Sequence, residues 1–230
     1  MRVLSWNVRA LRDDRSRIVT VLRDLHPDVV CLQEAPRWLR SRTRLAALAR
    51  EAGLLFVCGG RASTGPAVLV AMRVDVEWSA ELRFPKHPQR HRRGLAAASV
   101  RTGDRRLAVA SVHLGLDGRE RQEHASRVRR HLDAWEPDGV VVAGDLNEAP
   151  GGPAWRQLCD GLVDVAARGG LDYPTYPADR PRSRIDAIFV SPALGAASVD
   201  PRRPGLAQAT DHLPVVVDID LDLRSSEAPT

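Results

Sequence analysis

The sequence is poor in cysteine, and its few thiols are scattered. Cys31, Cys58 and Cys159 are odd in number and far apart along the chain. This pattern argues against a disulfide framework and against a cysteine metal site. We expect reduced thiols that fill space.

Long apolar runs are also missing. No run approaches the roughly 18 residues that a bilayer-crossing helix needs, and the N-terminal MRVLSWNVRA enters a strand pattern without a leader-like segment. We therefore expect a cytoplasmic protein with no membrane span. The 230 residues, 43% of them apolar, are enough for a substantial core in one domain.

Lysine and aromatic residues are scarce. Lys86 is the single lysine among 34 basic residues, and only ten residues are aromatic. The net charge of +5 favours an anionic partner such as nucleic acid, a phosphorylated substrate or a membrane surface, although the base composition of coding DNA also enriches arginine. The low aromatic content argues against a surface that stacks single-stranded bases.

Helical and strand patterns alternate along the chain, without an internal repeat. Apolar residues at helical spacing predict helices at 16–25, 37–53, 118–134 and about 154–162. A loop is expected at 166–183, and the end, 224–230, has the composition of a disordered tail. Short apolar runs predict strands at 2–8, 28–34, 54–59, 67–73, 76–82, 94–101, 106–114, 140–147, 184–191 and 213–221. This order favours an α/β sandwich with mixed sheets over a doubly wound sheet.

Six of the apolar runs present a carboxylate, an amide or an imidazole at or near one end. Such strand ends are where α/β proteins usually keep their chemistry. Each residue alone also has a structural explanation, because Asn caps turns, Glu begins helices, and a lone His in an apolar strand is often part of the core. The residues are Asn7, Glu34, His113, Asp145 with Asn147, Asp186, and Asp211 with His212.

Asp186 lies inside an apolar run, where an ionised carboxylate is costly unless it is paired or metal-bound. His212 is the natural partner, because a carboxylate on one ring nitrogen favours the protonated imidazole, which stabilises an anionic oxygen in a transition state. No Ser or Cys at these strand ends has an evident base beside it, which disfavours a serine or cysteine nucleophile. The remaining carboxylate and amide oxygens suit Mg²⁺ or Mn²⁺ better than zinc.

Six short motifs, in this order, resemble those of the endonuclease/exonuclease/phosphatase superfamily, which includes deoxyribonuclease I, exonuclease III, sphingomyelinases and inositol polyphosphate 5-phosphatases. The resemblance covers residues 3–219 and implies a four-layer α/β sandwich, with two packed mixed β-sheets flanked by helices. On this basis residues 1–223 are expected to form a single catalytic domain. The motifs are SWNV (5–8), CLQE (31–34), SVHL (111–114), GDLN (144–147), SRIDAIFV (183–190) and TDHLPV (210–215).

The resemblance also implies the metal ligands. Asn7 and Glu34 would hold Mg²⁺ or Mn²⁺, with Asp211 close by. Abasic-site nucleases of the group carry an acidic residue where this chain has Arg9, which argues against that activity.

The resemblance assigns catalytic roles to five residues. Asp145, helped by Asn147, would orient or deprotonate the attacking water, and Asp186 with His212 would donate to the phosphate. His113 would be a second imidazole on the phosphate side. Members with two working histidines usually support the first one with a Glu, and none is evident upstream of His113.

We therefore expect a metal-dependent hydrolase of phosphate esters, most of all a nuclease acting on DNA or RNA, and a monomer. Arg92 and Arg93 are candidates for binding the substrate phosphate, although a plain surface role is equally open. A phosphodiesterase or phosphatase for a small-molecule or phospholipid ester is the alternative, because the same site serves all of these. A catalytically weak member that only binds nucleic acid is the third.

Overall fold

The computed structural model describes residues 1–169, 171–203 and 205–221. The helices in this part of the chain are α1 (Arg15–Leu25), α2 (Ser41–Glu51), α3 (Gly118–Asp133), α4 (Pro153–Cys159) and α5 (Val165–Gly169). Two short 3₁₀ turns lie at Arg9–Leu11 and Leu206–Gln208. The strands are β1 (Arg2–Asn7), β2 (Val29–Gln33), β3 (Leu54–Gly59), β4 (Ala67–Ala71), β5 (Asp75–Arg83), β6 (Gly94–Thr102), β7 (Arg105–His113), β8 (Gly139–Asp145), β9 (Val163–Asp164), β10 (Asp186–Val190), β11 (Gly195–Val199) and β12 (Val215–Asp220).

The strands form two mixed sheets of six strands each. The first has the order β11-β12-β1-β2-β4-β3 and the second the order β5-β6-β7-β8-β10-β9. Each sheet has one parallel pair at its centre, β1 with β2 and β7 with β8, and the other neighbours pair antiparallel. The four strands of these two parallel pairs therefore end at the same edge of the molecule.

The central strands are apolar on both faces because both faces are covered. In β8, Val140 and Val142 belong to a cluster shared with α3 and α4, whereas Val141 and Ala143 belong to the cluster between the two sheets. Successive side chains of a strand point to opposite faces, so a strand buried on both sides needs a continuous apolar run. This explains the run that precedes GDLN.

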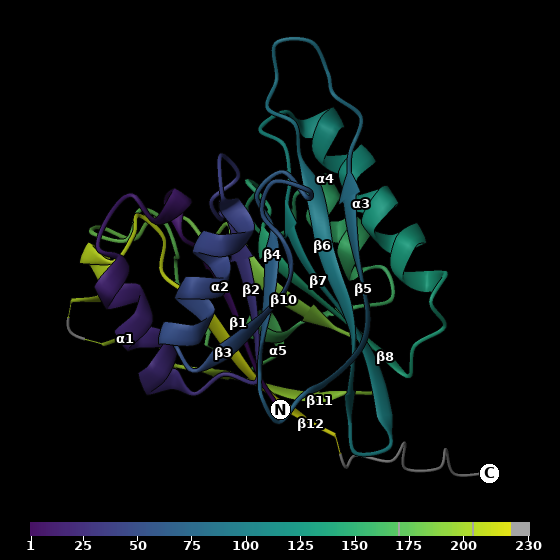
Figure 1. Ribbon diagram of the computed structural model, residues 1–230. Coiled ribbons are helices and arrows are strands. Elements are labelled where there is room, and N and C mark those ends of the chain that lie inside the picture. Colours follow the sequence, from purple (N-terminus) through teal and green to yellow (C-terminus); the bar gives the residue numbers. More distant parts are fainter. Residues whose placement is uncertain (170, 204, 222–230) are drawn as a thin grey trace.

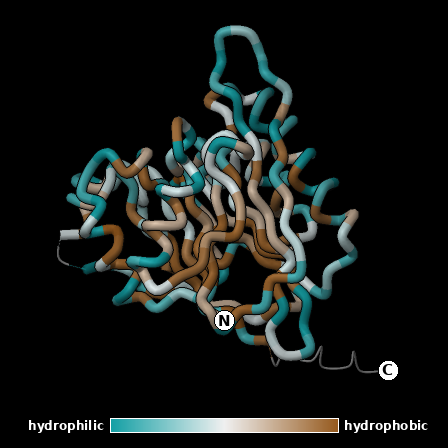
Figure 2. The backbone as a smooth tube through the Cα atoms, viewed as in Figure 1, coloured by the Kyte–Doolittle hydropathy of each residue, from teal (hydrophilic) through white to brown (hydrophobic). Residues whose placement is uncertain are grey.

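The helices complete a four-layer sandwich, as expected from the sequence. Figure 1 shows α1 and α2 on the outer side of the first sheet and α3 and α4 on the outer side of the second, with the two sheets packed between them. The brown interior of Figure 2 follows these sheets. Within the described ranges, no helix has both the length and the apolar character needed to cross a bilayer.

The structure differs from the sequence-based expectation mainly in small elements. α2 begins at Ser41 and not at Arg37. The expected loop at 166–183 opens with most of α5, and the edge strand β11 was not predicted. β11 has the sequence GAASV, whose small and only partly buried side chains carry little of the apolar signal on which strand prediction depends. The expected tail at 224–230 and the last residues of the expected domain, 222–223, lie outside the described residues.

Candidate active site

The polar strand ends meet at one edge of the molecule because of the strand directions. β1, β2, β7 and β8 end at this edge, while β10 and β12 begin there. In the second sheet, His113, Asp145 and Asp186 are direct register partners on β7, β8 and β10. The Nδ2 of Asn7, at the end of β1, donates to Asp145 Oδ2 across the two sheets at 3.0 Å. In Figure 1 this edge lies toward the top, away from the labelled N-terminus.

Asp145 lies at the centre of the cluster and is 2% exposed. Gly144 precedes it, and a Cβ at Gly144 would collide with the backbone of β7, so the glycine permits the close approach of the two strands. Besides the Asn7 amide, the backbone N–H of Asn147 donates to Asp145 Oδ1 at 2.9 Å. Burial raises the pKa of Asp145, the charge of Asp186 adds to the rise, and the pKa reaches about 7.

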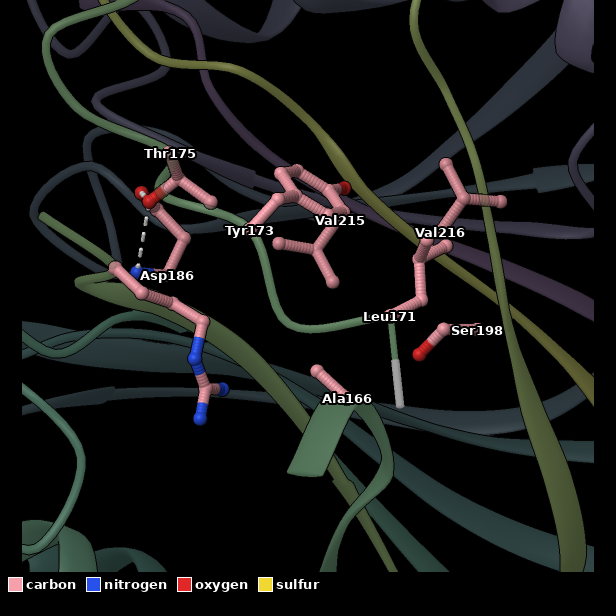
Figure 3. A pocket seen from close by; sticks show the side chains of 9 residues that line it. Ala166, Leu171, Tyr173, Thr175, Asp186, Ser198, Val215 and Val216 are labelled. Atoms are coloured by element: carbon pink, nitrogen blue, oxygen red, sulfur yellow. Dashed lines mark hydrogen bonds between the residues drawn. The ribbon is translucent and has the colours of Figure 1, made fainter. Parts of the chain in front are cut away.

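Asp186 and His212 form a buried pair. His212 Nδ1 donates to Asp186 Oδ2 at 2.9 Å, and Thr175 Oγ1 donates to the same oxygen at 2.6 Å. Figure 3 shows Thr175 beside Asp186. Burial would lower the pKa of His212, but the charge and hydrogen bond of Asp186, together with the charge of Asp145, outweigh it and raise the pKa to about 9. His212 is therefore an imidazolium at neutral pH, and its Nε2 lies 3.9 Å from Asp145 Oδ2.

His113 has the opposite electrostatic environment. Its Nδ1 lies 3.1 Å from Nη1 of Arg93, and its Nε2 lies 3.0 Å from Nδ2 of Asn147 and 3.3 Å from Asp145 Oδ2. Burial lowers the pKa of His113 well below its usual range, and the Arg93 cation lowers it further. Because a guanidinium only donates, Nδ1 accepts from Arg93, and the neutral ring then carries its proton on Nε2, facing Asp145 Oδ2. The Asn147 amide nitrogen, which also only donates, then has Leu114 O as its acceptor at 3.1 Å. The sequence showed no carboxylate partner for His113, and the structure places an arginine beside it.

A second group of carboxylates lies at the open side of the same edge. Glu34 has a left-handed backbone, with φ of 49°, and its side chain makes no hydrogen bond or ion pair with any residue that the structure describes. Asp211 is half-exposed and lies 3.4 Å from Nε of Arg9. The Oδ1 of Asn7 accepts from the backbone N–H of Arg9 at 3.1 Å, so that amide spans Arg9 and Asp145.

Several of the residues just described line a cleft of about 610 Å³. Arg93 lies in its wall, is 8% exposed, and has an Nε without a hydrogen-bond partner among the described residues. Arg92 is exposed and does not line the cleft. Two exposed aromatic residues, Trp38 and Tyr176, lie at its rim.

A profile of the family described as Endonuclease/Exonuclease/phosphatase matches residues 4–212. The chain belongs to this family. Its members hydrolyse phosphate esters, and the family resemblance of the six motifs is confirmed. One relative is YbhP of Escherichia coli (strain K12), an uncharacterized protein, which is 30% identical to this chain over 125 residues. That match covers 50% of this chain and 47% of YbhP, so the chain spans about half the length of the curated relatives it matches.

Solved structures of the endonuclease/exonuclease/phosphatase family share the fold over almost the whole chain. The mannosyl-6-phosphatase of Bacteroides thetaiotaomicron has a TM-score of 0.77 at 16% identity, and the match covers 96% of this chain and 99% of that one. TDP2 of D. rerio, in complex with a single-strand DNA product, has a TM-score of 0.74 at 22% identity, with 96% and 98% covered. These likenesses show a common fold among proteins named for different substrates.

Most of the residues selected from the sequence meet at the cleft. Asn7 and Asp186 lie behind it and bond residues that face it, and Arg92 lies outside it. The members that line the cleft are Glu34, Arg93, His113, Asp145, Asn147, Asp211 and His212. The fold thus brings together motif residues that lie as far apart in the sequence as Glu34 and His212.

Three ligand atoms at the base of the cleft lie close enough to hold a metal ion. One atom each from Asp145, Asp186 and His212 lies within 4.8 Å of the others. An imidazolium has no free lone pair, however, so only the carboxylates of this group can bind an ion, and of the Asp186 oxygens Oδ2 accepts two hydrogen bonds while Oδ1 has no partner among the described residues. The carboxylate of Glu34, which has no partner among the described residues, fits a hard cation better.

Some residues of the site carry no usable signal in the sequence. The Arg93–His113 contact joins two strands and replaces an expected carboxylate, so no motif predicts it. Trp38 and Tyr176 lie in loops, where neither period nor burial marks a side chain.

Proposed function

We propose that the chain is a divalent-metal-dependent phosphoesterase and, within that class, a nuclease that hydrolyses phosphodiester bonds in DNA or RNA. The observation that carries the proposal is the buried Asp186–His212 pair, which keeps a protonated imidazole directed at Asp145 in the cleft. A protonated imidazole held opposite a carboxylate is suited to transfer of a phosphoryl group to water. The carboxylate can take a proton from the water, and the imidazolium can stabilise the negative charge on the phosphate.

In this mechanism each residue acts from the atoms described above. Asp145, held by the backbone of Asn147, accepts a proton from the attacking water. His212, held by Asp186, donates from Nε2 to a phosphate oxygen as its negative charge develops. The bond between phosphorus and the leaving oxygen breaks, and that oxygen takes its proton from solvent. The guanidinium of Arg93, which lines the cleft, binds another phosphate oxygen.

His113 supports this arrangement as a neutral ring. With Nδ1 accepting from Arg93, its Nε2–H is directed toward Asp145 Oδ2 at 3.3 Å. We propose that it fixes Asp145 and donates on the phosphate side without adding charge.

We propose that a metal ion binds where Glu34 and Asp211 line the cleft, with Asn7 behind them. Glu34 and Asp211 offer carboxylate oxygens and Asn7 an amide oxygen, a set that suits Mg²⁺ or Mn²⁺. When bound, such an ion neutralises charge on a phosphate oxygen. We propose that these three residues hold it.

A plot of kcat/KM against pH is expected to be bell-shaped. Asp145 must be ionised and His212 protonated, so kcat/KM should rise through about pH 7 and fall through about pH 9. Asp186→Asn removes the charge that raises the His212 pKa, so the alkaline limb should move to lower pH. An alkaline limb that stays in place in this variant would contradict the assignment.

The nuclease proposal is supported by the charge of +5 and by the TDP2 structure with single-strand DNA. The likeness to a mannosyl-6-phosphatase favours the second candidate, a phosphatase or phosphodiesterase for a small-molecule or phospholipid ester. A catalytically weak member that binds nucleic acid is the third. We also propose a monomer, and light scattering after size-exclusion chromatography tests this.

A substrate panel with Mg²⁺, Mn²⁺ and EDTA tests the proposed function. We expect hydrolysis of plasmid DNA, single-stranded DNA or RNA, with an apparent KM that rises steeply with salt because phosphate contacts release counterions. Turnover of bis-p-nitrophenyl phosphate should respond little to salt. Asp145→Ala serves as the blank, and hydrolysis confined to sugar phosphates would favour the second candidate.

A further inference from the structure

Exposed aromatic rings gather at the cleft although the chain has few of them. Within the described ranges three aromatic side chains are exposed, Trp38, Trp78 and Tyr176, and two of these line the cleft. Trp38 is 73% exposed, and its ring carries the Arg37 guanidinium at 5.9 Å. The exposed face of Trp38 lies at the cleft together with Tyr176, so it is open to a planar ligand bound there.

Basic side chains without ion-pair partners among the described residues line the cleft together with these rings. Arg12, Arg37 and His91 line the same cleft and form no ion pair with any described residue. The loop between β5 and β6, residues 84–93, carries Lys86 and Arg92 and no acidic residue. This loop is the hydrophilic arch at the top of Figure 2, above the edge where the site lies.

The cleft continues beneath this arch. A second hollow of about 400 Å³ shares His91, Arg93 and Leu116 with the cleft. Ion pairs hold the arch over the start of α3, including one between Arg90 Nη1 and Asp117 Oδ1 at 2.8 Å. A substrate longer than one phosphate ester therefore has room on both sides of Arg93, toward Trp38 and toward the arch.

We propose that the cleft binds single-stranded nucleic acid, with one base beside the scissile phosphate stacked on Trp38 and the backbone on the far side running beneath the arch. This inference rests on the proposed function and names its substrate class. Aromatic faces interleaved with unpaired cations are the arrangement that single-strand binding uses, since stacking accepts any base and the cations follow the phosphates. A paired base in a duplex keeps its faces covered by its neighbours and offers none to Trp38.

Binding of labelled oligonucleotides in EDTA, where metal-dependent cleavage is blocked, tests the proposal. Fluorescence anisotropy compares a dT12 strand with a strand of the same length made of abasic tetrahydrofuran units. Trp38→Ala should weaken dT12 binding by on the order of tenfold and leave the abasic strand almost unaffected. Trp38→Phe should restore most of the dT12 affinity, because the ring face is kept.

Met72→Ala is the matched control, since Met72 is 81% exposed and lies at the opposite edge of the first sheet, beyond the end of β4. Equal dT12 affinity in wild type and Trp38→Ala would overturn the proposal, as would failure of the wild type to bind dT12. Displacement of dT12 by mannose 6-phosphate at a far lower concentration than by inorganic phosphate would do the same. A wild type that binds dT12 through Trp38 but hydrolyses nothing would instead refute the proposed function alone.

Discussion

Replacement of His212 by alanine is expected to lower kcat by about 10² to 10³ while the protein stays folded. In the wild type, Asp186 and Asp145 keep the ring protonated, so His212 supplies both a positive charge and a hydrogen bond to the phosphate. Alanine removes both at the point where charge develops. Steady-state kinetics on single-stranded DNA and on bis-p-nitrophenyl phosphate measure the effect.

The matched control is His26→Ala, because His26 is exposed and lies before β2, at the edge opposite to the cleft. It should keep wild-type kcat. Circular dichroism and thermal unfolding of both variants separate loss of chemistry from loss of fold. A His212→Ala enzyme with wild-type kcat would contradict the catalytic role of the imidazolium.

Removal of the divalent cation is expected to abolish activity, and Glu34→Gln is expected to raise the Mg²⁺ concentration needed for half-maximal rate. Glu34 has a carboxylate without a partner among the described residues, at the open side of the cleft. The amide of Gln keeps the shape and removes the charge. Outer partners of metal ligands typically contribute about 10- to 100-fold in metal affinity, and a direct ligand should contribute at least as much.

Titration of activity with Mg²⁺ and Mn²⁺ after treatment with EDTA measures this change. Glu136→Gln is the control, because Glu136 is exposed beyond the end of α3 and far from the motifs. It should leave the metal dependence unaltered. Activity that survives EDTA would refute the role given to the cation.

Much of the fold was predictable because its signals are local. The run from Val140 to Ala143 is buried on both faces, and its apolar side chains show this in the sequence. The strand β11 was not predictable, because its small side chains at a sheet edge carry almost no pattern. The start of α2 was misplaced because Arg37 and Leu39 fit a helical spacing that the chain does not adopt.

The candidate site, like the fold, was predictable from the sequence only in part. Asp186 required a partner because a lone buried charge is costly, and the structure pairs it with His212. The Arg93–His113 contact was not predictable, because it arises from strand pairing between Gly94 and His113 and from no motif. The low aromatic content argued against stacking, yet the exposed position of Trp38, which composition does not report, is what supports it.

The most direct test of the account is a crystal structure with Mn²⁺ and inorganic phosphate, in which anomalous scattering locates the metal. The account predicts one peak coordinated by Glu34, with the phosphate between it, Arg93 and His212. A peak coordinated by Asp186 and His212, or one remote from Glu34, would contradict the convergence of these strand ends on one phosphate.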